Sequence, residues 1–132
     1  MNSRTVGPDA FARTLEDMLG EVTDKMADEL PKAVSASARL GREKVVENAS
    51  RVVESHSGRY LAGWANRRKT EGRLKVTGYV YNRDVPGLAH LLEKGHAKVG
   101  GGRVAARVHI APAAEEAFDE FERRIERAVD SL

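Results

Sequence analysis

The chain has 132 residues, which predicts a single domain, 1–132, large enough to fold without a metal ion or disulfide bonds. It contains no cysteine, and this excludes a disulfide framework, a thiol nucleophile and a cysteine-based zinc site. No apolar run reaches the roughly 18 residues of a membrane span, and no apolar signal-peptide core follows Met1. We therefore expect a protein that is made and kept inside a cell.

The net charge is only +2, but it is unevenly distributed. Residues 58–110 carry 11 Lys/Arg and 3 Asp/Glu, whereas residues 1–57 have a net charge of −2 and residues 111–132 a net charge of −4. This asymmetry predicts either a nucleic-acid surface or basic and acidic faces that meet between copies of the protein. Only 5% of the residues are aromatic, which disfavours a stacking platform for nucleic-acid bases.

The first 57 residues are predicted to be helical. Pro8 suits the first position of a helix, where its missing N–H costs nothing. Apolar residues then recur three or four positions apart, which predicts a helix over residues 8–30 with one apolar stripe. The stripe consists of Phe11, Leu15, Met18, Val22, Met26 and Leu30. Pro31 interrupts the pattern, so the sequence predicts either a second helix that ends near Val53 or one long helix kinked at Pro31.

Two segments after residue 57 show the alternation of apolar and polar residues that is typical of half-buried strands. They are residues 60–69 and 74–82, and Glu71-Gly72 supplies a turn between them. We therefore predict a β-hairpin. Its first strand ends in three cations, which are interpreted either as exposed edge charges that discourage aggregation or as part of an interface. These cations are Arg67, Arg68 and Lys69.

The remaining residues predict a short helix, a loop, a third strand and a last helix. The short helix covers Leu88–Lys94, with Gly95 as a left-handed C-cap, and the glycines within residues 96–103 make the following loop costly to order. Residues 104–110 alternate again, which predicts a third strand that pairs with the hairpin. One face would carry Val104, Ala106, Val108 and Ile110, and the other Ala105, Arg107 and His109. Pro112 opens an amphipathic C-terminal helix.

Together these elements predict an α+β fold. A small antiparallel sheet of about three strands packs against helices, with a long N-terminal helical region (1–57) and a C-terminal amphipathic helix. Residues 58–132 then hold the hairpin, the short helix, the third strand and the last helix.

The chain offers little that is typical of catalysis or metal binding. His90, His96 and His109 lack the spacing of a helical zinc site. The glycine run that ends in Arg103 leads into a strand, whereas a phosphate-binding P-loop opens a helix. We therefore predict no catalytic residue, no metal site and no cofactor. The alternative is a small ribonuclease, with His109 or His90 as acid–base group and Arg103 and Arg107 stabilising phosphate charge.

The segment LAHLLEKGHAKVGGGRVAARVHIAPAAEEA resembles the diagnostic part of a family of long-tailed bacteriophage proteins, variously called minor structural, tail-completion or neck proteins. In that family a tyrosine-containing strand leads to a helix of the form LAHLLExGH, a variable glycine-rich loop, a strand ending in HIAPA and a C-terminal helix rich in Glu and Arg. The corresponding pieces here are Tyr79–Asn82, Leu88–His96, Gly100–Arg103, Val108–Ala113 and Glu115–Val129. SGRYLAGW, Ser57–Trp64, also resembles the entry into the family's first strand. The N-terminal helices match only in kind.

The resemblance implies a non-enzymatic part of the virion that is made in the bacterial host cytoplasm. It implies a ring around the DNA channel at the neck, which helps to complete the tail or to join it to the DNA-filled head. The partners would be neighbouring copies of itself, head-completion or connector proteins, and tail-terminator or tail-tube proteins. Contact with passing DNA would lack sequence specificity, and no membrane would be involved.

A ring is a head-to-tail assembly, so the basic hairpin and loop of one copy are expected to meet the acidic last helix of the next. The interface residues predicted on this basis are Arg67, Arg68, Lys69, His96, Lys98, Arg103, Glu115 and Glu116. The second hypothesis is a nucleic-acid-binding protein that uses the basic segment 58–110, and the ribonuclease is the third.

Overall fold

The computed structural model describes the backbone of residues 8–54 and 58–132, and the side chains within those ranges from residue 17 onwards. The predicted α+β class is confirmed: a long N-terminal helix, two small antiparallel two-stranded sheets, and a C-terminal helix packed against the first helix. In chain order the elements are α1 (Pro8–Val52), α2 (Arg59–Ala62), β1 (Trp64–Gly72), β2 (Lys75–Asn82), α3 (Pro86–Lys94), β3 (His96–Ala97), β4 (Arg103–Val104) and α4 (Ala111–Asp130).

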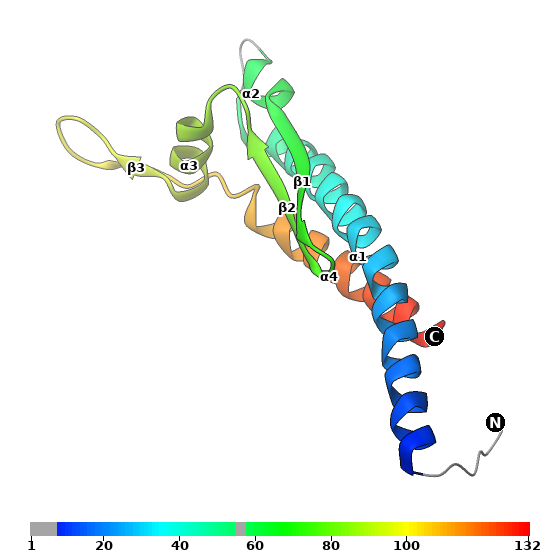
Figure 1. The fold of residues 1–132 in the computed structure, drawn as a ribbon. Coiled ribbons are helices and arrows are strands. Elements are labelled where there is room, and N and C mark those ends of the chain that lie inside the picture. Colours follow the sequence, from blue (N-terminus) through cyan, green and yellow to red (C-terminus); the bar gives the residue numbers. More distant parts are fainter. Residues whose placement is uncertain (1–7, 55–57) are drawn as a thin grey trace.

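The molecule is built along α1 (Figure 1). The β1–β2 hairpin and α4 both pack along α1 from about Asp24 towards its C-terminal end, with Arg73 of the hairpin turn paired with Asp24. α2 and α3 lie near the end of the hairpin that is distant from its turn. The N-terminal part of α1 runs past the end of α4, while the connection between β3 and β4 projects away on the other side (Figure 1). No described helix is long and apolar enough to cross a membrane.

Pro31 does not divide α1, so the alternative of one long helix is the correct one. A proline inside a helix removes one backbone hydrogen bond and costs about 3 kcal/mol. Packing around the next turns offsets this cost, since Ala33 and Val34 are buried. On the hairpin side, the Arg68 guanidinium donates to the Pro31 carbonyl at 3.2 Å and to the Ser35 hydroxyl at 2.9 Å.

Small residues let the hairpin and α4 approach α1 closely. A Cβ atom added to Gly41 would lie 3.3 Å from both Ala117 on α4 and Val80 on β2. A Cβ atom on Gly78 would lie 2.9 Å from the Val34 side chain. The Ala-rich and Ser-rich stripe of the second half of α1 is therefore the surface on which both other layers rest.

The predicted hairpin is confirmed, with two shifts. β1 and β2 pair antiparallel from Trp64 opposite Asn82 down to Gly72 opposite Lys75, so the turn falls at residues 73–74, two positions later than Glu71-Gly72. The first strand also begins later than predicted, because residues 59–62 form α2. That short helix buries Tyr60, which is only 3% exposed.

The predicted third strand over residues 104–110 is wrong. Only Arg103–Val104 is extended and paired, and its partner is His96–Ala97 rather than the hairpin. The predicted alternation also fails at two positions, since Val108 is 50% exposed and His109 is fully buried. Ile110 does pack against the core, and Arg107 is exposed. The physical reason is that side-chain and helix-end hydrogen bonds hold this segment near α3, as described below.

Gly95 allows the chain to turn from α3 towards β3. Its φ of 72° confirms a glycine-type helix end, although its ψ of 177° lies outside the left-handed helical region. Only glycine adopts this backbone conformation readily. A Cβ atom here would also lie 2.5 Å from the Val104 carbonyl oxygen and 2.9 Å from the Ala106 nitrogen.

We predict that Gly95→Ala lowers the free energy of unfolding by about 2–4 kcal/mol, because strain and a backbone clash add. Chemical denaturation followed by circular dichroism measures this loss. Gly87→Ala is the matched control, since a Cβ atom at Gly87 would meet nothing within 4 Å. Equal stability of the two variants would contradict this role for Gly95.

Candidate functional site

The segments that carry the phage-protein resemblance meet in one buried cluster, which we call the junction cluster: Tyr60, Trp64, Glu93 and His109. His109 is 0% exposed, Tyr60 3% and Trp64 7%. The three rings stand edge to face, with centroids 5.7 Å apart for Tyr60 and His109 and 6.3 Å apart for Trp64 and His109. Edge-to-face packing is a favourable arrangement of aromatic rings.

Hydrogen bonds fix the protonation pattern of the His109 ring. Nδ1 lies 2.6 Å from the Arg107 carbonyl oxygen, and because a carbonyl can only accept, Nδ1 carries the proton. Nε2 is then the acceptor in the neutral ring, and the Tyr60 hydroxyl donates to it at 2.5 Å. Both ring nitrogens therefore have partners despite complete burial.

Glu93 caps the start of α4 from outside that helix. Its Oε1 accepts the backbone N–H groups of His109 and Ile110, both at 2.8 Å, and its Oε2 accepts that of Ala111 at 3.0 Å. The first N–H groups of a helix have no partner within the helix, and a negative charge there also favours the helix dipole. The residue at the N-cap itself, Ile110, provides no side-chain cap, so a glutamate on α3 performs that role.

The environment acts in opposite directions on the two ionisable oxygen groups of the junction cluster. Burial raises the pKa of Glu93, but the three backbone donors and the nearby His109 ring outweigh it, and the net pKa is lowered. Burial, followed by the negative charge of Glu93, raises the pKa of Tyr60 to about 12. The Trp64 indole opposes this rise slightly without reaching hydrogen-bond geometry to the Tyr60 hydroxyl.

Two asparagines extend this framework. Asn82 donates to the Tyr60 carbonyl at 2.8 Å, and its side-chain oxygen accepts the backbone N–H groups of Asp84 and Val85. Asn48 on α1 donates to the His109 carbonyl at 3.2 Å. The framework thus connects α1, α2, the end of β2, α3 and the start of α4.

The three rings of the junction cluster are buried, which limits their chemistry, whereas the Glu93 side chain is 15% exposed. His109 is fully buried, so the acid–base role that the ribonuclease hypothesis gives to it would require the cluster to open. Arg107, expected there to stabilise phosphate, instead donates to the Val52 carbonyl at 2.9 Å. His90 is exposed on α3. Within the described ranges, no three His, Asp or Glu side chains lie close enough together to hold a metal ion.

The three cations of the hairpin that were predicted to form an interface already have partners within the chain. Arg67 stacks 4.5 Å above the centre of the Tyr79 ring, and Lys69 pairs with Glu71 at 2.9 Å. Arg68 is bound to α1, so replacing it would disturb the hairpin itself as well as any partner. Arg67 and Lys69 are the two of this set that face away from α1.

The other predicted interface residues lie apart from the hairpin cations. His96 and Arg103 belong to the small β3–β4 sheet, and Lys98 lies in its turn, where the Lys98 N–H donates to the Gly102 carbonyl at 2.9 Å. Glu115 and Glu116 are exposed near the start of α4. One copy therefore does not bring the eight predicted residues together, and they could meet only between copies.

A larger feature that the sequence did not reveal is an apolar hollow of about 420 Å³, which we call the central groove. Its floor is the second half of α1, one wall is mainly β2, and the other wall is the first half of α4. It is lined by Val34, Ser37, Ala38, Gly41, Val45, Trp64, Gly78, Val80, Ile110, Ala114, Ala117, Phe118 and Phe121. Phe118 is 68% exposed, so the α4 wall presents an uncovered aromatic ring.

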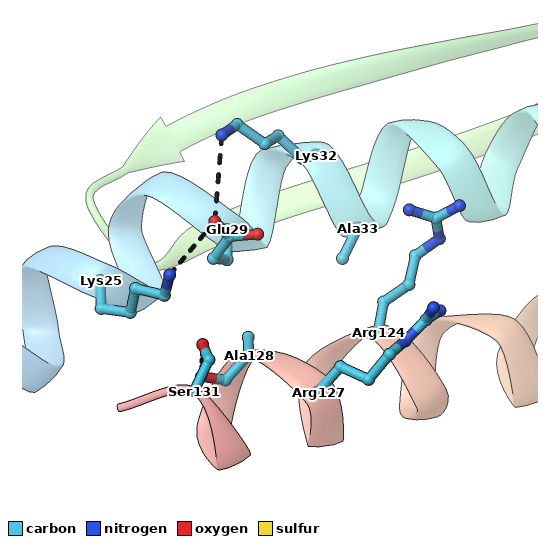
Figure 2. A pocket seen from close by; sticks show the side chains of 8 residues that line it. All are labelled: Lys25, Glu29, Lys32, Ala33, Arg124, Arg127, Ala128 and Ser131. Carbon is cyan, nitrogen blue, oxygen red and sulfur yellow. Dashed lines mark hydrogen bonds and ion pairs between the residues drawn. The ribbon is translucent and has the colours of Figure 1, made fainter.

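A second, smaller hollow of about 200 Å³ lies between α1 and the end of α4 (Figure 2). On the α1 side, Glu29 lies between Lys25 and Lys32 and pairs with them at 3.8 and 3.9 Å. Arg124 and Arg127 come from α4, and both also pair with Glu120. The cations of this hollow therefore have acidic partners within the chain.

Scans of protein-family models, curated proteins and solved structures found no significant match to this chain.

We predict that Tyr60→Phe lowers the free energy of unfolding by about 1–3 kcal/mol, because Nε2 of His109 loses its buried donor. The raised pKa of Tyr60 also adds a pH dependence: its stabilising contribution is complete below pH 10 and is lost as the pH rises towards 12. Denaturation of both proteins between pH 8 and pH 12 tests this. A wild-type protein that loses no more stability than Tyr60→Phe across this window would contradict the assignment.

We predict that Glu93→Gln costs about 1–3 kcal/mol, because the cap of α4 loses its charge and one acceptor oxygen. The lowered pKa of Glu93 means that its contribution is complete above pH 4.5 and is lost as the pH falls below that value. Glu93→Gln should therefore show a smaller loss of stability below pH 4.5 than wild type. Glu116→Gln, at an exposed position on α4, is the control and should change little.

Proposed function

We propose that this chain is a structural virion protein of the neck or tail of a long-tailed phage. In this role it helps to complete the tail, or joins it to the DNA-filled head, through a ring of copies around the DNA channel. The observation that carries the proposal is the junction cluster. The three resembling segments, SGRYLAGW, LLEKGH and HIAPA, contribute Tyr60, Glu93 and His109 to one hydrogen-bonded core.

This convergence supports the proposal because each resembling segment contributes a residue that holds the fold together. Residues shared by a structural family are expected to hold its fold together, whereas those of an enzyme family are expected to line an open site. Tyr60 and His109 are buried and serve packing and capping. Met18 and Leu19 on α1 and Val99 in the β3–β4 turn are exposed and remain available for partners. Both segments project from the rest of the molecule (Figure 1).

The proposed partners are neighbouring copies, head-completion or connector proteins, and tail-terminator or tail-tube proteins. In a head-to-tail ring, each copy presents two different surfaces to its neighbours. The basic hairpin, with Arg67 and Lys69 outward, and the acidic first turns of α4, with Glu115 and Glu116, lie on separate parts of the surface. Charges placed in this way suit contacts between copies better than contacts within one copy.

A second candidate is binding of nucleic acid by the basic segment 58–110. The observation in its favour is the outer face of the hairpin, where Arg67 stacks on Tyr79 and Tyr81 is 37% exposed. Phosphate contacts would make affinity fall steeply with salt. Titration of labelled DNA and RNA at several salt concentrations distinguishes this candidate from the structural one, which requires no such binding.

The proposed function predicts that a phage with this gene deleted produces heads and tails that do not join, or tails malformed at their upper end. Negative-stain electron microscopy of the lysate measures this, with a complemented deletion as the control. Complementation by Gly87→Ala should restore joined particles, whereas Gly95→Ala should restore fewer. Normal infectious particles from the deletion phage would contradict the proposal.

A further inference from the structure

The open edge of β2 carries backbone groups without partners. The Arg83 N–H donates to the Gly63 carbonyl at 2.7 Å, which makes these two residues a hydrogen-bonded pair of the antiparallel ladder. Such pairs alternate with pairs whose N–H and C=O groups point away from the other strand. In the observed register, the β2 residues of the second kind include Val76, Gly78 and Val80. The described part of the chain supplies no hydrogen-bond partner for their outward backbone groups, since β2 pairs only with β1 there.

This open edge faces the central groove. β1 lies on one flank of α1, where Arg68 donates to the Pro31 carbonyl. Further round the helix, Gly41 is close to both Val80 on β2 and Ala117 on α4, since an added Cβ atom would lie 3.3 Å from each. β2 is therefore the strand nearest to α4, and its open edge lines the groove between them.

The hairpin covers only part of the helical layer beneath it. Neighbouring strands lie about 4.8 Å apart and packed helices about 8–10 Å apart, so two strands are roughly as wide as one helix. β1 and β2 lie over α1, whereas α4 leaves the Phe118 ring 68% exposed beside the groove. Two further strands next to β2 would cover α4 as β1 and β2 cover α1. The space and the open edge together therefore fit a two-stranded hairpin better than a helix.

The chain contains a second hairpin that has not joined a larger sheet. β3 and β4 pair only with each other among the described strands, and the connection between them projects from the molecule (Figure 1). Val99, at the turn of this hairpin, is fully exposed. A two-stranded hairpin on its own is marginally stable in water and gains stability when it joins further strands or packs on a helix.

The hydrogen bonds of the β3–β4 hairpin show which of its faces would meet the groove. The Lys98 N–H donates to the Gly102 carbonyl at 2.9 Å, so these residues form a hydrogen-bonded pair, and Ala97 next to them directs its N–H and C=O outward. Residues directly opposite each other in antiparallel strands have their side chains on the same face of the sheet. Pairing of Ala97 with the open edge of β2 would place its small side chain on the groove side, as for Val80, and the Lys98 side chain on the solvent side.

We propose that the β3–β4 hairpin of one copy of this chain adds to the open edge of β2 in another copy, with β3 antiparallel to β2. The four strands then form one sheet over α1 and α4 of the receiving copy. Addition of a strand to an exposed sheet edge is a common mode of docking, in which main-chain hydrogen bonds supply affinity and alternate side chains supply specificity. β3 is the inner strand because Arg103, which lies opposite Ala97 in the hairpin, is then on the outer strand at the exposed rim of α4.

The hairpin cannot fill the groove of its own chain, because its base is fixed beside α3. The Arg107 N–H donates to the Leu92 carbonyl at 2.7 Å, and Gly95 lies against the backbone of Val104. From this base the hairpin extends away from β2 (Figure 1). The contact must therefore form between copies, and a hairpin given to the next copy generates a head-to-tail assembly. The proposal rests on the proposed function in so far as a ring of copies is the assembly that it would build.

The absence of cysteine from the chain allows a direct cross-linking test. One full-length protein carries Val99→Cys, and a second, of different mass, carries Phe118→Cys. The two are mixed at the highest soluble concentration with a flexible bismaleimide. The mixed product should form roughly tenfold faster or more than with Lys32→Cys as the second protein, because docking raises the effective concentration of the thiols. Phe118 and the Lys32 side chain are similarly exposed, 68% and 71%, but Lys32 lines the smaller hollow instead of the groove.

A proline on the open edge of β2 tests the backbone pairing. Proline lacks the N–H, and an edge strand tolerates it where that N–H faces outward. Val76→Pro, added to the Phe118→Cys protein, should therefore abolish the acceleration. Thr70→Pro is the matched control, since Thr70 is the cross-strand neighbour of Val76 and its N–H points to the other edge of the hairpin. Circular dichroism verifies that both variants remain folded.

A charge on the β3–β4 hairpin tests which of its faces docks. Ala97→Glu, added to the Val99→Cys protein, should also abolish the acceleration, because it places a carboxylate in the apolar groove. Lys98→Glu, on the opposite face, is the control; it changes the charge more and should leave the rate largely unchanged. Both residues are exposed in the single copy, so neither substitution removes a core contact. This pair of variants also decides the test if Val76→Pro fails to fold.

Rapid cross-linking that is lost with Val76→Pro and Ala97→Glu, but retained with their controls, would support the proposal. A rate equal to that of the Lys32→Cys control would overturn it, and so would equal losses with Ala97→Glu and Lys98→Glu. If sedimentation showed oligomers without this cross-link, the hairpin contact would be wrong while the proposed ring would stand. An undisturbed deletion phage would instead count against the proposed function, and the cross-linking result does not depend on that outcome.

Discussion

The rest of the structure depends on one carboxylate. Glu93 holds the start of α4 by accepting three consecutive backbone N–H groups, and it does so from the last turn of a different helix. This fixes where the segment after the glycine-rich turn ends and where α4 begins. With α4 placed, its small residues can meet the small residues of α1, and the central groove forms between α4 and the hairpin. The buried rings of His109 and Tyr60 pack beside this carboxylate, whose side chain is 15% exposed.

The sequence predicts the regular elements well because each has a local cause. The apolar spacing of α1, the alternation of the hairpin, the C-cap glycine at Gly95 and the proline at the start of α4 act over a few residues. The prediction of a third strand is wrong because the structure of this segment depends on a distant residue rather than on a local pattern. The alternation in residues 104–110 is genuine, but the Glu93 carboxylate, 16 residues before His109, draws the backbone of that residue into the core. Local periodicity cannot show a hydrogen bond between distant residues.

The candidate functional residues divide in the same way, into those with a local sequence signal and those that depend on contacts between distant segments. The charge pattern predicts Arg67, Lys69, Glu115 and Glu116 as exposed groups, and they are exposed. The charge pattern could not show that Arg68 donates hydrogen bonds to Pro31 and Ser35, since these bonds require the packing of β1 on α1. Glu93 was not singled out because a lone glutamate has no distinctive spacing. The convergence of three resembling segments was the available signal for the junction cluster, and the central groove became visible only with three elements in place.

A body locked by the junction cluster, with the central groove open beside it, is the architecture expected of a part that functions when assembled. The measurement that tests this most directly is quantitative mass spectrometry of purified virions, with the chain counted against a connector protein of known copy number. The account predicts that the chain is present at a fixed low copy number, of the order expected for one ring. A chain that is abundant in infected cells and absent from purified virions would contradict it.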